Sequence, residues 1–236
     1  MPTVAEVLGL DVIPYRLEFL EPVLGTAAAD ANVYSRYIAA KAFREDGSLR
    51  PDVHTTEEAI RAESGTLPED EEGLRPGYTV FHRDEKGIFV YDYWIRGFLK
   101  SAAQPLGLKV QGKRKEIGLT ASVVDQYVFP FPRKIRFQRD GKPIVEPEGA
   151  LERPLRAMTA LGPRVSLARS DIVREGATLE FELRVVAGKL TEAELDQLFA
   201  YGALTGLGQW RNASWGRFKA YRRTTAGRWV AVAEPD

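Results

Sequence analysis

The residues of this chain that are best suited to binding chemistry are aromatic, basic and small residues interleaved near the C-terminus. The segment from Gly202 to Phe218 contains Gly206, Gly208, Trp210, Arg211, Asn212, Trp215 and Arg217. Exposed aromatic rings stack on bases and arginine neutralises phosphates, a combination typical of proteins that bind single strands. Tryptophan is also frequently buried. Each ring therefore has two interpretations, a stacking surface or a part of the core.

The glycines in this segment do not form a nucleotide loop. The Gly-Lys-Ser/Thr sequence of a P-loop is absent, and the run follows a predicted helix, whereas a dinucleotide fingerprint follows a strand. We expect Gly202 to end that helix in the left-handed conformation. Gly206 and Gly208 permit a close backbone approach, either to a neighbouring strand or to a phosphate backbone.

Catalytic and metal-binding constellations are absent from the sequence. There is no cysteine, and the two histidines, His54 and His82, stand apart with no spacing that suits zinc or iron. We interpret His82 as a surface or capping residue. No nucleophile elbow or catalytic triad is recognisable. The sequence favours a non-catalytic protein with no metal and no cofactor.

Charge is balanced overall and uneven locally. The 33 basic residues equal the 33 acidic ones, so no global field attracts polyanions. From Gln197 to Ala233, however, the chain has no acidic residue and several arginines. This asymmetry predicts a basic face, although an ordinary solvated surface is the alternative.

The first half of the chain predicts strands, helices and one insertion. Strict alternation predicts a strand over Tyr15 to Leu20, and a helix with Asp92 as its cap is expected over Tyr93 to Gln104. The remaining expectations are a short helix from Asn32 to Lys41, an acidic insertion at 43–76 with a capping box at 55–58, a hairpin of 78–81 with 88–91, and a basic loop at 112–115.

The second half predicts an antiparallel arrangement that ends in a helix and two strands. An extended stretch over 127–137 contains Pro130 and Pro132, which favours an edge strand or irregular structure. Leu151 to Ser170 fits a long hairpin or extended loop. A strand is expected over 178–185, a helix capped by Thr191 and Glu194 over 191–201, and final strands near 217–222 and 228–233.

This order of elements resembles the RAMP superfamily of CRISPR-associated proteins. Gly206, Gly208 and Gly216 match that family's late glycine-rich loop, and Arg96-Gly97 with Lys100 matches its helix motif. The chain is also similar to uncharacterised phage and prophage proteins with a Gly-Leu-Gly-Gln-Trp-Arg-Asn signature. It departs from the family at Tyr91-Asp92-Tyr93-Trp94, where a Pro-Gly-Ser-Ser sequence is usual, and at Trp210 and Trp215.

The resemblance implies an α+β fold with a ferredoxin-like (RRM-like) βαββαβ core and large insertions. We expect a single domain over 1–236, with the insertion 43–76 and a projecting segment 138–170. The arginines of the projecting segment would line a groove that follows a nucleic-acid backbone: Arg153, Arg156, Arg164 and Arg169. The resemblance also implies subunits that stack along a strand, and a less favoured nuclease with Asp30 in an early loop.

Two functional hypotheses follow from these patterns. The leading one is a cytoplasmic, non-catalytic protein that binds single-stranded nucleic acid, RNA more than DNA, as a possible homo-oligomer or hetero-complex and with no membrane segment. The contacts would come from Lys100, the four arginines of the projecting segment, and the interleaved loop. The alternative is a phage or phage-defence structural protein that uses the tryptophan-arginine loop as a protein interface.

Overall fold

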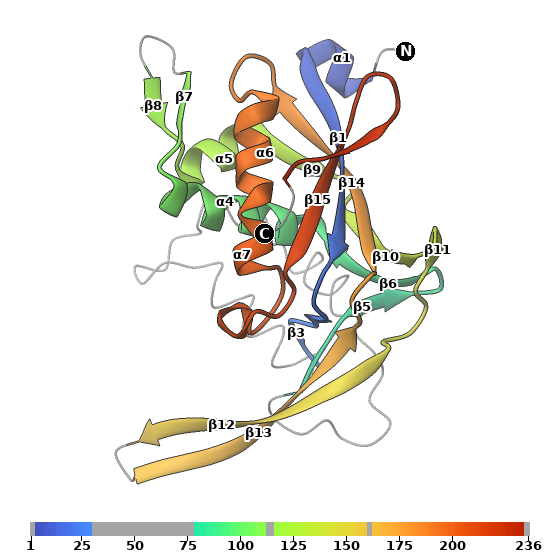
Figure 1. Cartoon of the computed structure of the whole chain (residues 1–236), viewed down its shortest axis with the longest axis vertical. Helices are drawn as coiled ribbons and strands as arrows, with labels where there is room; N and C mark the ends of the chain where they lie inside the picture. The colour runs from blue at the N-terminus through green and yellow to red at the C-terminus, as the bar shows by residue number, and fades with distance from the viewer. Residues whose placement is uncertain (1–2, 30–77, 112–115, 160–161, 234–236) are drawn as a thin grey trace. The chain divides into compact units, whose positions relative to one another are not determined.

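The computed structural model describes residues 3–29, 78–111, 116–159 and 162–233. They form a mixed α+β structure of mostly antiparallel sheets and few helices (Figure 1). The chain divides into two compact units, unit 1 (1–23, 89–143 and 174–236) and unit 2 (24–88 and 144–173). Most of the segment predicted to project, 138–170, belongs to unit 2.

Unit 1 is built on a sheet in the order β16-β15-β1-β14-β10-β6. These strands are β16 (Trp229–Ala231), β15 (Phe218–Arg223), β1 (Leu10–Phe19), β14 (Thr178–Val186), β10 (Lys134–Arg139) and β6 (Gly87–Tyr91), and β9 (Val128–Phe131) also pairs with β14. Neighbouring strands in this order run antiparallel; Tyr15, for example, faces Phe181 on one side and Arg222 on the other. The strands predicted at 15–20, 178–185 and the C-terminus are confirmed.

Two helices cover one side of this sheet, α4 (Asp92–Leu106) and α6 (Glu192–Ala200). The ring of Phe199 in α6 lies 4.4 Å from that of Tyr15 in β1. The ring of Phe98 in α4 lies 6.1 Å from Phe199 and 5.1 Å from Phe218 in β15. These aromatic contacts hold both helices on one face (Figure 1). Because side chains alternate along a strand, the residues between the buried ones point to the opposite face.

A polar network joins α6 to the same face of the sheet. The buried Tyr15 hydroxyl donates to Asp196 at 2.7 Å, and Arg222 Nε donates to the same carboxylate at 3.1 Å. Arg222 also forms an ion pair with Glu192 at 2.6 Å. Burial and the bond to Asp196 raise the pKa of Tyr15. The network satisfies the one polar group of a core tyrosine.

The helix ends confirm some sequence predictions and correct others. Thr191 and Glu194 form the predicted capping box of α6. Asp92 is not a cap: Tyr91 is the N-cap of α4, and Asp92 is its first residue. Gly202 does not end α6 in a left-handed conformation; it opens α7 (Gly202–Thr205), where a Cβ atom would collide with the Phe218 ring. This glycine is required by packing.

Several short elements of unit 1 were not predicted. These are α1 (Val4–Leu8), α5 (Ala121–Tyr127), and the pair β7 (Lys109–Gln111) and β8 (Glu116–Gly118). The stretch expected to be extended from Tyr127 therefore begins one residue later, in β9. It breaks at Pro132 before β10. β9 pairs with β14 alone among the described residues, which confirms the predicted edge for 128–131, whereas residues 134–137 belong to β10, which lies between β14 and β6, so the prediction is wrong there.

Unit 2 contains a long antiparallel hairpin, β12 (Gly149–Thr159) with β13 (Gly162–Val173), which confirms the hairpin expected there. β13 also pairs with β2 (Val23–Leu24) and, in parallel, with β4 (Tyr78–Val80), which in turn pairs with β3 (Ala27–Ala28). β5 (His82–Asp84) then turns at residues 85–86 into β6. A small core cluster is made of Ala27, Ala29 and Val80.

Polar side chains link β4 to β13 in unit 2. The Tyr78 hydroxyl donates to Asp171 at 2.8 Å, and the hydroxyls of Thr79 and Ser170 lie 2.8 Å apart. Burial raises the pKa of Asp171 and raises the pKa of Tyr78 to about 12. His82 is buried, with 3% of its surface exposed, so its interpretation as a surface residue is wrong.

Some predictions lie outside the described residues. They are the helix 32–41, the insertion 43–76 with its capping box, the basic loop 112–115, and the residues Asp30 and His54. Among the helices that the structure describes, none has both the length and the apolar character needed to cross a membrane.

Candidate nucleic-acid interface

The interleaved loop is anchored at its base by its own backbone. Leu207 N–H donates to Gly216 C=O at 2.8 Å, and Gly216 N–H donates to Pro22 C=O at 2.9 Å. Gly206 and Gly216 both have positive φ, and a Cβ atom on either would collide with backbone atoms of the facing segment. For Gly206, one of the two glycines for which alternatives were left open, the close approach is therefore to the backbone of the chain itself.

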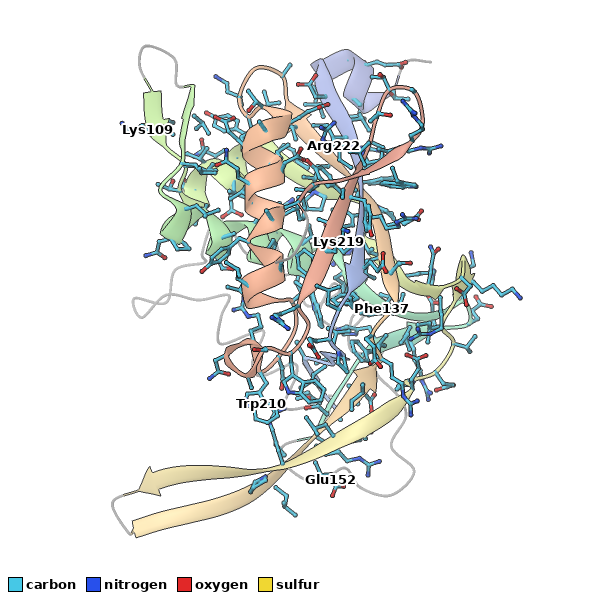
Figure 2. The ribbon with its side chains drawn as sticks, in the orientation of Figure 1. Lys109, Phe137, Glu152, Trp210, Lys219 and Arg222 are labelled. Carbon is cyan, nitrogen blue, oxygen red and sulfur yellow. The ribbon has the colours of Figure 1, made fainter. Side chains whose placement is uncertain are left out.

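The two tryptophans lie beyond this base and stack on each other. Their ring centroids are 5.9 Å apart and the rings are inclined by 17°. Trp210 has a left-handed backbone with φ of 55° and keeps 39% of its surface exposed, and Trp215 is half-buried. Figure 2 labels Trp210 at the loop between α7 and β15. Trp210 therefore lies at the surface of unit 1 and is not part of the core, while Trp215 is only partly exposed beneath it.

A short 3-10 turn, η1 (Arg211–Ala213), carries the polar residues of the loop. Arg211 and Asn212 are both exposed, next to the tryptophan pair in the chain. The Arg211 guanidinium is held only loosely, because its Nη1 lies 3.4 Å from the hydroxyl of Ser101 in α4. Arginine, amide and aromatic groups are thus presented together to solvent.

The other predicted cations of unit 1 are ion-paired. Arg217 lies 3.1 Å from Glu21, and Lys100 lies 2.6 Å from Asp125, where it links α4 to α5. Arg222 is bound by Asp196 and Glu192. Acidic residues from other parts of the chain therefore neutralise part of the positive charge of the acid-free stretch 197–233. Arg211 is the loop cation best placed to meet a phosphate.

The four arginines of the β12-β13 hairpin do not share one face. In the register, Arg153 faces Ala168 and Arg156 faces Val165. Alternation places the positions of Arg153 and Arg164 on one face of the ribbon, and those of Arg156 and Arg169 on the other. Burial lowers the pKa of the Arg153 guanidinium, whereas Arg169 lies over the Tyr78 ring at 5.0 Å and 3.9 Å from Glu152.

The open side of the unit 1 sheet carries aromatic and basic residues that sequence reasoning missed. Arg16 Cζ in β1 lies 4.9 Å from the ring centroid of Tyr221 and 5.0 Å from that of Trp229. Arg184 Cζ in β14 lies 3.8 Å above the ring of Phe131 in β9. The alternation in each strand was visible in the sequence, but the order of the strands was needed to bring these residues together.

No group of three or more histidine, cysteine or acidic residues that could hold a metal ion exists among the residues the structure describes. The comparisons with known proteins are negative as well: no family model matches the chain, and no curated protein matches it.

Proposed function

We propose that the protein binds single-stranded nucleic acid, with RNA preferred to DNA, and does not cleave it. The observation that carries this proposal is the stacked pair of the exposed Trp210 and the half-buried Trp215, beside the exposed Arg211 and Asn212. An indole face stacks on any base, and a guanidinium neutralises the phosphate next to it. The amide of Asn212 adds a hydrogen-bonding group for a base edge.

The strand order supports a ferredoxin-like core as the finer description of the fold. β1, α4, β9 with β10, β14, α6 and β15 follow one another as βαββαβ, and β15-β1-β14-β10 is an antiparallel order with two helices on one side. Together with the glycine loop this is the arrangement that the RAMP resemblance implies. The preference for RNA, a cytoplasmic location and assembly along the strand are proposed on that resemblance.

The test is fluorescence anisotropy with labelled single-stranded RNA and DNA oligonucleotides across a salt series. We expect affinity to fall steeply with salt, because phosphate contacts release counterions. Trp210→Ala should weaken binding by about fivefold or more, the cost of about 1 kcal/mol or more for one stacked base. Arg211→Ala should lower the salt dependence more than Arg217→Ala, because Arg217 is already paired with Glu21. Absence of binding at low salt would refute the proposal.

A second function is favoured by one further observation, the exposed apolar side chain of Leu204. It keeps 72% of its surface exposed in α7, the element that leads into the tryptophan loop. Leucine and tryptophan exposed together are typical of protein interfaces. In that case the protein serves a phage or phage-defence assembly, and Leu204→Ser changes its association state in sedimentation while oligonucleotide binding is absent.

A further inference from the structure

β16 is a border strand of the unit 1 sheet, because it pairs only with β15 among the described residues. Val232 N–H, just beyond its end, donates to Ala220 C=O at 2.9 Å, toward β15. Backbone groups alternate in direction along an antiparallel strand, so those of Val230 also point toward β15, and those of Trp229 and Ala231 point away from it. On that outer side, neither Trp229 nor Ala231 has a backbone hydrogen-bond partner within the described ranges.

This border strand lacks the features by which proteins usually prevent strand pairing. Edge strands normally carry charged residues, proline or a bulge. Two other border strands of unit 1 follow this rule, since Pro130 lies in β9 and Lys142 with Pro143 makes up β11. β16 (229–231) contains no charged residue and no proline. Its outer edge is therefore suited to accept a further strand.

The side chains of β16 favour an apolar partner. Val230 keeps 49% of its surface exposed. It lies opposite Arg222, labelled in Figure 2, whose guanidinium is bound by Asp196 of α6. On the other face of the sheet, the Trp229 ring lies 5.0 Å from the Arg16 guanidinium, a cation–π contact that holds the indole in place. An exposed valine and a positioned indole thus accompany the unpaired backbone groups.

The strand is complementary to itself. A two-fold axis through Val230 would place two copies of β16 antiparallel, with Trp229 of each copy opposite Ala231 of the other. These are the residues whose backbone groups point outward, so both pairs would exchange N–H···O bonds. Val230 would face its own counterpart in a pair without hydrogen bonds, where side chains come closest. The large indole then meets a small methyl group, the two valines meet each other, and no like charges face one another within the strand.

We propose that β16 pairs antiparallel with β16 of a second copy of this chain, which joins two unit 1 sheets into one across a two-fold axis at Val230. The occupant is a second copy because the outward backbone groups, the indole–methyl pairs and the valine pair all match under a single two-fold operation. Such an interface closes at two copies. Assembly along a nucleic-acid strand needs head-to-tail contacts instead, and the dimer does not rest on nucleic-acid binding.

Sedimentation velocity over a concentration series, without nucleic acid, measures this association. We expect a dimer that dissociates on dilution, because a strand of three residues provides a small interface. Ala231→Pro removes an outward N–H but leaves the β15–β16 hydrogen bonds, and should abolish the dimer. Val230→Lys sets two like charges against each other on the axis and should abolish it too. Val145→Lys adds the same charge at a 60% exposed position in unit 2, and this matched control should leave the dimer unchanged.

Single cysteines test the register, because the chain has no cysteine of its own. Opposed Cα atoms in a pair without hydrogen bonds lie about 4.5 Å apart, within the range that a disulfide spans. Val230→Cys should therefore give a covalent dimer under mild oxidation. Val232→Cys is the matched control on the same face of the sheet. Its counterpart in the second copy lies about 13 Å away along the strand, so it should not crosslink.

The outcomes separate this inference from the proposed function. A chain that stays monomeric at every concentration, or a dimer that Ala231→Pro and Val230→Lys leave intact, overturns the inference. If Leu204→Ser dissociates the dimer and the β16 variants do not, the interface is the tryptophan loop instead. Circular dichroism at low concentration checks that each variant keeps the fold of the monomer. Oligonucleotide binding by a chain that never dimerises overturns this inference alone, whereas a dimer that binds no oligonucleotide overturns the proposed function alone.

Discussion

Two glycines with opposite surroundings, Gly216 and Gly97, give opposite predictions for the same substitution. Gly216 has a φ of 72°, and a Cβ atom there would collide with the Leu207 carbonyl; Gly97 lies in α4 with open space around it. Gly216→Ala should lower the free energy of unfolding by about 2 kcal/mol or more. Gly97→Ala should raise it by about 0.5–1 kcal/mol. Urea unfolding followed by circular dichroism measures both.

The Gly97→Ala variant also tests the resemblance to the RAMP family at one residue. Gly97 belongs to the helix motif that matches the RAMP family, yet nothing around it in unit 1 requires a glycine. If Gly97→Ala is more stable and binds oligonucleotides like the wild type, the motif has no role in binding. If Gly216→Ala leaves the free energy of unfolding unchanged, Gly216 does not approach the Leu207 carbonyl closely in solution.

The raised pKa of Tyr78 predicts that stability declines at alkaline pH. Below about pH 10 the phenol is protonated in both folded and unfolded chains. Between about pH 10 and the folded pKa of about 12, the unfolded chain loses its proton first, so rising pH favours unfolding. Tyr78→Phe should make the decline of the urea midpoint with pH less steep. Equal slopes for both proteins would show that the hydrogen bond to Asp171 is absent in solution.

At the scale of elements, the same capping motif occurs twice with different consequences. Thr191 with Glu194 caps α6, whose Leu195, Leu198 and Phe199 are buried, whereas Thr3 with Glu6 caps α1, which buries no residue. Thr191→Ala should cost about 1 kcal/mol of global stability, because α6 forms part of the core. Thr3→Ala should leave the global unfolding midpoint unchanged. Equal losses in the two variants would mean that α1 is packed firmly on the sheet, contrary to its lack of buried residues.

The elements that could be predicted from sequence are those whose local pattern agrees with their place in the core. Alternation in β1 and β14 and the capping box of α6 are signals of this kind. α5 was missed because its short apolar run is also compatible with a strand. The Thr3–Glu6 capping box is also present in the sequence, and it begins a helix of only five residues.

The residue types of the candidate site could be predicted from the sequence, but the ion-pair partners of its cations could not. The loop residues were found because aromatic and basic types cluster within one segment. The partners of Arg217 and Lys100, Glu21 and Asp125, could not be foreseen, since the first pair is 196 residues apart and both depend on packing. The aromatic and basic residues on the open side of the unit 1 sheet could not be grouped without the strand order, because β1, β9 and β15 are distant in the chain.

At the scale of the whole molecule, the two units differ in their cores and in their fluorescent probes. All four tryptophans, Trp94, Trp210, Trp215 and Trp229, fall in unit 1. Among the described residues, unit 1 buries many large aromatic side chains, such as Tyr15, Phe98 and Phe199, whereas unit 2 buries Phe81 with Leu24, Ile88 and a cluster of alanines with Val80. Less apolar area is buried for each small side chain, so we expect unit 2 to unfold first.

Urea unfolding followed by two signals tests this expectation. Circular dichroism reports on both units and should begin to change at a urea concentration about 1 M lower than tryptophan fluorescence, for a stability difference of about 1–3 kcal/mol. Asp171→Asn and Asp196→Asn form a matched pair, since each carboxylate accepts a tyrosine hydroxyl, at 2.8 Å in unit 2 and 2.7 Å in unit 1. Asp171→Asn should shift only the early transition, and Asp196→Asn should shift the fluorescence transition. Coincident transitions that both variants move together would instead make the chain a single cooperative folding unit.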